Sequence, residues 1–165
     1  MRVLAYCFLS LLLFFAFPIL SKAELLNTKG SDGQEMIRSL ESLRDLDYQT
    51  WQVVAYPELE QDSKVVLRIV GYPGSLRINH PANLEVKSGI RDWDLKDITL
   101  KNSELANDSR QAAAEFNLSP LLEDLTNNRP LRVFLPGVIN ELPIPPYVVS
   151  EWRSLKIAKS LDEIN

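Results

Sequence analysis

The most constraining feature of this chain is a change of hydrophobic period at Thr50. From there to Asn102, short segments alternate apolar and polar side chains at every second residue, with turn residues between the segments. Such alternation is typical of half-buried β-strands. Strands joined by turns of a few residues pair in antiparallel fashion, because parallel pairing needs longer crossovers. The pattern predicts an antiparallel meander.

Five strands are expected in this region. The first has Trp51, Val53 and Ala55 on one face, and the second, residues 64–72, is rich in β-branched side chains and predicts a central strand. The others are SLRIN (75–79), NLEVK (83–87) and RDWDLKDITLKN (91–102), where a slip after Leu95 indicates a β-bulge. Between the second and third, Tyr72-Pro73-Gly74-Ser75 fits a type II turn.

The segments on either side of the meander are less uniform. Residues 34–47 place Ile37, Leu40, Leu43 and Leu46 at helical spacing, which favours an amphipathic helix. A hairpin arm is the alternative, because SLRDLDYQTWQVV has a turn-like centre. Residues 102–115 are polar and Ala-rich, and predict a loop or weak helix.

A short helix and a further strand are expected after that loop. In NLSPLLEDLTNN, Ser119 is a suitable N-cap and Pro120 suits the first helical position. Its predicted apolar face is Leu121, Leu122 and Leu125. The stretch PLRVFLPG then restores strand alternation, with Leu131, Val133 and Leu135 inward.

The stretch ELPIPPYVVSEWRSL (141–155) has two interpretations. Its PxxP spacing would suit an exposed polyproline ligand. However, Pro146 can begin a helix that continues to about Lys159, with one apolar stripe and with Ser150, Glu151, Arg153 and Lys156 facing away. That stripe consists of Val148, Val149, Trp152 and Leu155. We therefore favour a helix that closes an open sheet face.

Together these elements predict an α+β domain. Its antiparallel sheet has about five to seven short strands, and two or three helices cover one face. A single globular domain is expected over 24–165, with flexible ends at 24–33 and 160–165.

The first residues have the features of a signal peptide. A short positive start precedes an almost wholly apolar run from Val3 to Leu20, which Pro18 interrupts, and small residues at Ser21 and Ala23 suit cleavage after Ala23. An uncleaved membrane anchor is the alternative, although the run is short for a spanning helix. After cleavage, no membrane-spanning segment is expected.

Composition limits the function further. Removing residues 1–23 takes away Arg2 and Lys22, which changes the formal charge from −4 to −6 and argues against nucleic-acid binding. The only cysteine, Cys7, also leaves with the signal, so no disulfide partner or thiol chemistry is expected.

No residue pattern indicates a catalytic or metal centre. His80 is the only histidine and lies in INHPAN, where a surface turn is the simpler interpretation than a general base. Asp92, Asp94 and Asp97 flank Trp93, but they lack EF-hand spacing, so a solvated strand face explains them better than calcium binding. We expect no cofactor, no metal and no enzymatic activity.

Several blocks together resemble a known family. The blocks that carry the resemblance are WQVVAY, LRIVGYPG, FNLSPLLEDL, RPLRVFLPG and ELPIPPYVVSEWR. Residues 38–153, which contain them, are similar to an uncharacterised family of exported cyanobacterial proteins, known only as a domain of unknown function. The resemblance implies a periplasmic or thylakoid-lumen location. It offers no catalytic residues.

The expected function follows from these points. The leading hypothesis is a non-enzymatic accessory protein that binds a membrane protein complex, such as a photosynthetic complex during assembly. The alternative is a carrier of a small apolar ligand or pigment, with a pocket between sheet and helix near the three tryptophans. A hydrolase that uses His80 is the third. The candidate structural or binding residues are Trp51, Tyr72, Pro73, Gly74, Trp93, Pro145, Pro146, Tyr147 and Trp152.

Overall fold

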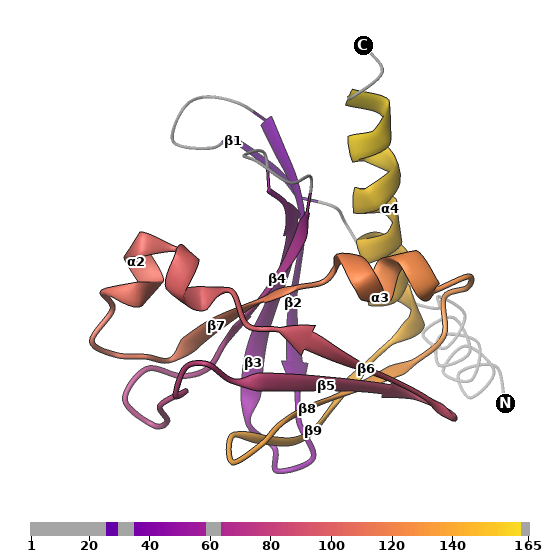
Figure 1. Ribbon diagram of the computed structural model, residues 1–165. Coiled ribbons are helices and arrows are strands. Elements are labelled where there is room, and N and C mark those ends of the chain that lie inside the picture. The colour runs from indigo at the N-terminus through magenta and orange to yellow at the C-terminus, as the bar shows by residue number, and fades with distance from the viewer. Residues whose placement is uncertain (1–25, 30–34, 59–63, 163–165) are drawn as a thin grey trace, which may run out of the picture.

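Two antiparallel sheets form the body of the chain in the computed structural model, which describes residues 26–29, 35–58 and 64–162 (Figure 1). The first sheet has five strands in the order β1-β2-β3-β4-β7: Leu26–Lys29 (β1), Glu35–Arg44 (β2), Thr50–Pro57 (β3), Val65–Val70 (β4) and Ala113–Asn117 (β7). The second has four in the order β6-β5-β8-β9: Arg91–Lys96 (β6), Asn83–Ser88 (β5), Leu131–Leu135 (β8) and Ile139–Ile144 (β9). The helical segments are Thr99–Lys101 (η1), Ser103–Ala106 (α2), Ser119–Asp124 (α3) and Pro146–Asp162 (α4).

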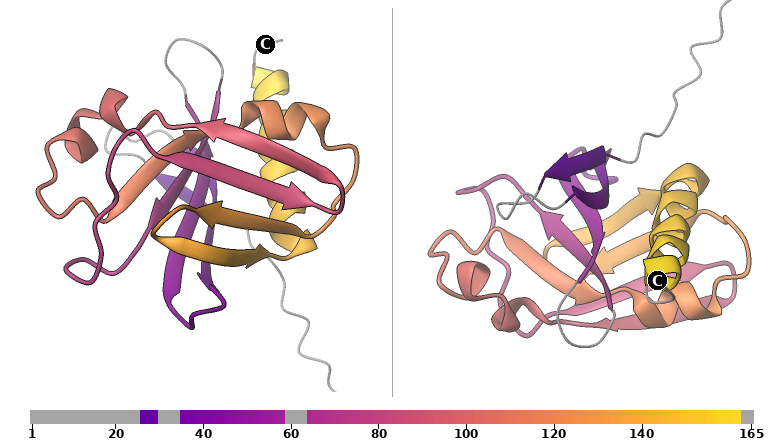
Figure 2. Two further views of the ribbon diagram at one scale, coloured as in Figure 1. Left: turned by 60° about the horizontal axis from the view of Figure 1, so that its bottom comes forward. Right: turned by 90° about the horizontal axis from the view of Figure 1, so that it is seen from above.

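The α+β class is confirmed, but the prediction of one sheet with helices on one face is wrong. The strands divide between two sheets, and those of the first run across those of the second (Figure 1). Helix α4 packs on β2 and β3, and α3 packs on α4 and β6. Helix α2 lies on the far side of the molecule from α4 (Figure 2). Helices therefore flank the first sheet instead of covering one face.

The sheets also meet at two edges. An isolated bridge joins Asp97 to Phe116 of β7, and the Ile98 amide donates to the Glu115 carbonyl at 2.8 Å. At the other edge, the Leu46 amide donates to the Glu141 carbonyl at 3.0 Å. These contacts occupy backbone groups that an open sheet edge would leave unpaired.

The predicted inward faces agree with the structure. Trp51, Val53 and Ala55 of β3 are buried, as are Leu84 and Val86 of β5. The predicted inward residues of β8, namely Leu131, Val133 and Leu135, are buried as well. Strand β4 lies between β3 and β7, as expected of a central strand.

Strand β2 replaces the helix predicted over residues 34–47. It pairs with β3 over Ser39 to Arg44, so the hairpin alternative is the correct one. Ser39 and Leu43 face the core opposite Ala55 and Trp51, and this pairing outweighs the helical spacing of the apolar residues. Residues 26–29, expected in a flexible segment, form β1 against β2.

The meander ends after β4, where residues 71–82 cross from the first sheet to the second. The predicted strand 75–79 does not form; the structure has only a single bridge there, between Leu76 and Pro73. The Ile78 amide donates to the Gln111 carbonyl at 2.8 Å, in the loop before β7. Gly71 allows this path, since a Cβ atom there would lie 2.7 Å from the Trp51 ring. The predicted type II turn is confirmed: Gly74 has a φ of 88° and the Ser75 amide donates to the Tyr72 carbonyl.

The region after β5 differs from the prediction in two places. Strand β6 ends at Lys96 and a 3₁₀ turn follows, so Ile98 is buried and Leu100 is exposed without the expected bulge. Of residues 102–115, expected as a loop or weak helix, residues 103–106 form α2, whereas residues 113–115 begin β7. Two alanines begin β7, and their short side chains fit the buried sheet although they favour helix.

The C-terminal part follows the sequence more closely. Residues 142–145, where each proline disfavours helix for the residue before it, are expected to be extended, and residues 142–144 are indeed the end of β9 (139–144). Strand β9 pairs with β8 at the edge of the second sheet, where Pro143 is tolerated. Helix α4 begins at Pro146, and all four residues of its predicted stripe are buried. Helix α3 begins at Ser119 instead of after it, because the Ser119 hydroxyl accepts from the Val65 amide at 2.9 Å.

One α4 residue expected to face solvent is instead buried. Glu151 is 6% exposed and accepts a hydrogen bond from the Ser39 hydroxyl at 2.5 Å. Residues 160–162, expected to be flexible, continue the helix. Of the helices in the described ranges, none combines the length and apolar character that crossing a lipid bilayer requires.

Candidate binding surface at the loop end

Three connections that are far apart in sequence gather at one end of the molecule. They are the β2–β3 turn (45–49), the β8–β9 turn (136–138), and the second half of the crossover with the first residue of β5 (77–83). We call this surface the loop end. The first turn bonds to the start of β9, just after the second turn, because Asn140 Nδ2 donates to Asp47 Oδ2 at 2.7 Å. Figure 1 shows the β2–β3 and β8–β9 turns side by side. Binding residues are often presented on loops that a rigid sheet positions.

Asp45 fixes the β2–β3 turn to the core. Its Oδ1 accepts from the Gln49 amide at 2.8 Å, and its Oδ2 accepts from Trp51 Nε1 at 2.8 Å. Asp45 itself is 5% exposed. The turn is therefore held by a buried carboxylate with two donors, which satisfies the indole nitrogen of the buried Trp51 as well.

This turn projects two apolar side chains into solvent. Tyr48 is 84% exposed and Leu46 is 59% exposed. Tyr48 has a φ of 65°, a left-handed conformation that is uncommon for residues other than glycine and costs about 1–2 kcal/mol. A strained backbone that holds an exposed aromatic side chain is more often found at functional surfaces than elsewhere.

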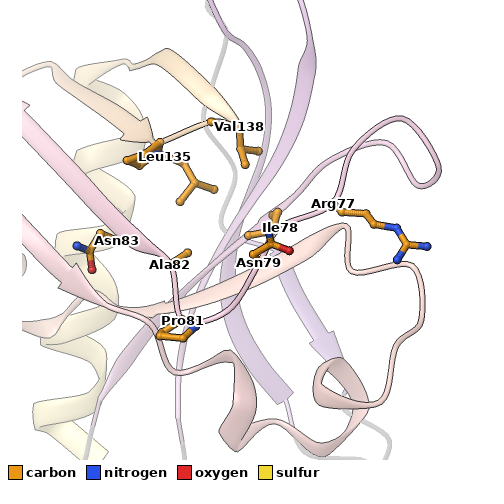
Figure 3. Close-up of a pocket in the computed structure, with 10 residues that line it drawn as sticks. Arg77, Ile78, Asn79, Pro81, Ala82, Asn83, Leu135 and Val138 are labelled. Atoms are coloured by element: carbon orange, nitrogen blue, oxygen red, sulfur yellow. The ribbon is translucent and has the colours of Figure 1, made fainter.

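A cavity of about 450 Å³ opens beside the β8–β9 turn. Leu135 and Val138 lie on one side of it, and Pro81, Ala82 and Asn83 lie on the other (Figure 3). Its volume is in the range of small-molecule sites, which is about 300–1,000 Å³. The cavity gives the loop end a recess between the crossover and the β8–β9 turn.

His80 is held by Asp97 in the crossover. The His80 Nδ1 and Asp97 Oδ2 atoms are 2.8 Å apart, and the Ala82 and Thr99 amides also donate to this carboxylate. Burial acts to raise the pKa of Asp97, but the hydrogen bonds from Thr99, His80 and Ala82 lower it below its usual value. Among the described residues, no hydroxyl or thiol bonds to His80. The pair therefore ties the crossover to the end of β6.

The predicted tryptophans do not form a common pocket. Trp51 and Trp152 are fully buried in the core, and Trp93 is half-buried on β6, where its Nε1 donates to Asp124 at 3.0 Å. None of the three lines the cavity at the loop end or the other two described cavities. The three tryptophans therefore do not mark a carrier pocket between sheet and helix among these described cavities.

The other predicted residues fall on two separate surfaces. Tyr72, Pro73 and Gly74 form an exposed turn, with Tyr72 77% exposed. Pro145 is half-buried before α4, and Pro146 and Tyr147 are exposed in its first turn. The Tyr147 hydroxyl is 3.4 Å from Glu41 Oε2. Ala23, the predicted cleavage site, lies outside the described residues.

The aspartates around Trp93 are also separated by the fold. Asp92 and Asp94 are exposed on the outer face of β6, as expected of a solvated strand, whereas Asp97 bonds to His80. Within the described ranges, no three carboxylate, imidazole or thiol side chains gather in a way that could hold a metal ion.

A second buried polar centre lies on the outer face of the first sheet. Glu115 accepts hydrogen bonds from the Tyr56 hydroxyl, from Arg68 Nε at 2.7 Å and from Asn102 Nδ2 at 3.2 Å. Burial and the Glu115 carboxylate raise the pKa of Tyr56, so this hydroxyl remains a donor. Burial acts to lower the pKa of Arg68, but its bonds to Glu115 and Tyr56 outweigh this effect. We call these four residues the Glu115 network.

The sequence did not reveal the surface residues of the loop end. Leu46 was assigned to the apolar stripe of a helix, and Tyr48 carried no functional interpretation. The available signal was the turn-like DLDYQ between two strand patterns, where an apolar and an aromatic residue stand among polar ones. Large apolar side chains exposed together on a turn indicate an interaction surface.

Comparison with known proteins supports the resemblance only at the level of the family. The sequence model of a family described as "Protein of unknown function (DUF3122)" matches residues 23–155. The chain belongs to this family. Searches of curated proteins and of solved structures find no match.

Proposed function

We propose that this DUF3122 protein is an exported accessory protein without catalytic activity, and that it binds another protein through the loop end. The observation that carries the proposal is the exposure of Leu46 and Tyr48 on a turn that the buried Asp45 holds in place. Exposed aromatic side chains on a rigid support contribute most to protein interfaces, because little conformational entropy is lost on binding.

The location and the partner are part of the same proposal. The signal features at residues 1–23 support export, and the resemblance supports a cyanobacterial periplasm or thylakoid lumen. The partner we propose is a membrane protein complex, such as a photosynthetic complex during assembly. An acidic chain gains little from anionic lipid headgroups, which favours contact with protein over contact with the lipid surface.

The test is purification of the tagged protein from its native cells in mild detergent, followed by mass spectrometry. We compare the native protein with Tyr48→Ser and with Tyr72→Ser as the matched control, because both tyrosines are highly exposed on turns. We expect a stoichiometric membrane-complex partner that is lost with Tyr48→Ser and retained with Tyr72→Ser. A partner that is retained in both variants would contradict the loop-end assignment.

The cavity favours a second candidate, a carrier of a small ligand. The volume of about 450 Å³ is adequate, although the cavity lies at the loop end instead of near the tryptophans. Native mass spectrometry of the protein purified from its own cells would show a bound molecule. Val138→Trp, which adds bulk to the lining, would then abolish that extra mass without affecting the Tyr48-dependent partner.

A further inference from the structure

A second cleft lies on the other side of Arg77 from the loop-end cavity. It has a volume of about 530 Å³ and is lined by Gly74, Ser75, Leu76, Arg77, Ser109 and Arg110. We call it the arginine cleft. Its two walls are the type II turn before residue 77 and the loop before β7, which lie more than thirty residues apart in sequence. Figure 3 shows the Arg77 guanidinium pointing away from the loop-end cavity.

The donors in this cleft are largely unused. Arg77 is exposed and makes no side-chain hydrogen bond or ion pair within the described residues, and the same holds for the Ser109 hydroxyl. Arg110 donates from Nε to Asp108 Oδ1 and from Nη2 to Asp108 Oδ2, both at 2.9 Å. Its Nη1 has no partner in the part of the chain that the structure describes. The Ser75 hydroxyl donates to the Tyr72 carbonyl at 2.8 Å and is not available as a donor.

Positive charge exceeds negative charge at this place, although the whole chain is acidic. None of the lining residues is a carboxylate, and Asp108, just outside the lining, is neutralised by Arg110. The Arg110 hydrogen bonds lower the pKa of Asp108, so this ion pair persists in mildly acidic solution. The Arg77 charge remains without compensation from the lining.

Backbone hydrogen bonds hold the two walls together. The Gly71 amide donates to the Ala112 carbonyl and the Ile78 amide donates to the Gln111 carbonyl, both at 2.8 Å. A Cβ atom at Gly74 would meet nothing within 4 Å, so the space in front of this glycine is open. The backbone of the two walls is thus held in place, so ligand binding has to order the side chains alone.

We propose that the arginine cleft binds an anionic phosphate group, with Arg77 as the principal contact. The planar guanidinium suits bidentate binding of phosphate oxygens, and Ser109 and Arg110 Nη1 add donors from the opposite wall. The cleft is larger than a bare phosphate ion, so the natural ligand is a phosphate ester. The proposal does not depend on the protein-binding surface at Leu46 and Tyr48.

The test is a titration of the full mature chain, followed by backbone amide NMR. The probes are inorganic phosphate, glycerol 3-phosphate, and vesicles of phosphatidylglycerol with phosphatidylcholine vesicles as reference. We expect saturable shifts at residues 74–77 and 109–110 with millimolar phosphate, and stronger binding of glycerol 3-phosphate. Binding to phosphatidylglycerol vesicles alone would show that the phosphate is that of a lipid headgroup.

The decisive variant is Arg77→Gln, which should weaken phosphate binding roughly tenfold because a charge-assisted contact is lost. Arg44→Gln is the matched control, since Arg44 is an exposed arginine at the end of β2 without a side-chain partner in the described part of the chain. Equal weakening by both variants would show general screening and overturn the site. Absence of saturable shifts with every probe would overturn it as well, while leaving the Tyr48-dependent partner untouched.

Discussion

Glu115 and Glu151 are carboxylates with nearly equal burial, at 4% and 6% exposure, in very different surroundings. Glu115 accepts hydrogen bonds from a tyrosine, an arginine and an asparagine side chain. Glu151 accepts one side-chain hydrogen bond, from Ser39, and its Oε1 is buried without a partner in the described part of the chain. Glu151 also lies near another acid, because its charge contributes to raising the pKa of Glu41.

The difference indicates two ways to attach a peripheral segment to the same sheet. On the outer face, the Glu115 network attaches the η1–α2 segment through polar pairing, because Asn102 both bonds Glu115 and caps α2. On the inner face, α4 is held by its apolar stripe. Repulsion between Glu41 of β2 and Glu151 of α4, which we call the acid pair, opposes that attachment. We call the contact of α4 with β2 and β3 the α4 seam. Packing should dominate stability there, and hydrogen bonding should dominate in the network.

The largest effect is expected from removing the packing of the α4 seam. Trp152 is fully buried, so Trp152→Ala should lower the free energy of unfolding by about 3–5 kcal/mol. Chemical denaturation monitored by circular dichroism measures this change. Pro143→Ala is the control, because Pro143 is exposed on the edge strand β9 and should cost much less. The reverse order would mean that β9, and not α4, closes the core.

The next effect is expected from the Glu115 network. Glu115→Ala leaves Arg68, the Tyr56 hydroxyl and Asn102 without their acceptor, and should cost about 3 kcal/mol. A buried pair can cost more, but the Arg68 side chain is 31% exposed and water replaces part of the loss. Glu115→Gln keeps one acceptor oxygen and should cost less. Equal, small losses in both variants would show that the network contributes little.

A matched pair of hydroxyl deletions compares the two carboxylates directly. Ser39→Ala removes the one side-chain donor to Glu151 and should cost about 2 kcal/mol, because a buried charged group loses its partner. Tyr56→Phe removes one of several donors to Glu115 and should cost about 1 kcal/mol. Thermal unfolding of both variants gives the comparison. A larger loss for Tyr56→Phe would reverse the ranking of the two sites.

The sequence predicted those parts of the fold in which local pattern and burial agree. The alternation in β3, β5 and β8 and the stripe of α4 were readable because each buried face repeats with the period of its element. Strand β2 was obscured because its apolar residues also suit a helix, and only pairing with β3 decides between the two. The acid pair was not readable either, since Glu41 and Glu151 are brought together by the packing of α4 on β2.

Most residues of the loop end and of the arginine cleft could not be predicted as functional from the sequence, for the same reason. The sequence places Asp45 in the expected helix 34–47, Arg77 in the expected strand 75–79 and Arg110 in the expected loop or weak helix 102–115. Their importance depends on contacts that the sequence pattern does not show. Gly74 was identified, because a type II turn requires a residue that accepts positive φ. Local conformational requirements were therefore predictable, whereas convergence of separate loops was not.

The smallest effect concerns the pH dependence of the α4 seam. Burial and the charge of Glu151 raise the pKa of Glu41, although the hydrogen bond from Tyr147 opposes them. A folded-state pKa above the unfolded value stabilises the fold at pH below the unfolded pKa, and this contribution is lost as pH rises through the folded value. Glu41→Gln should therefore stabilise the protein at neutral pH, by less than about 1 kcal/mol because Glu41 is partly exposed.

The measurement is the midpoint of urea unfolding from acidic to neutral pH. The native protein should lose stability relative to Glu41→Gln as the pH rises from below the ordinary glutamate pKa toward neutrality. Glu123→Gln is the control, because Glu123 is exposed on α3 and makes no side-chain hydrogen bond or ion pair in the described residues. The unfolding midpoint of this variant should follow the same pH dependence as that of the native protein. If Glu41→Gln also follows the native pH dependence, the two acids of the seam do not interact. The contrast between the seam and the Glu115 network would then rest on the unpaired oxygen of Glu151 alone.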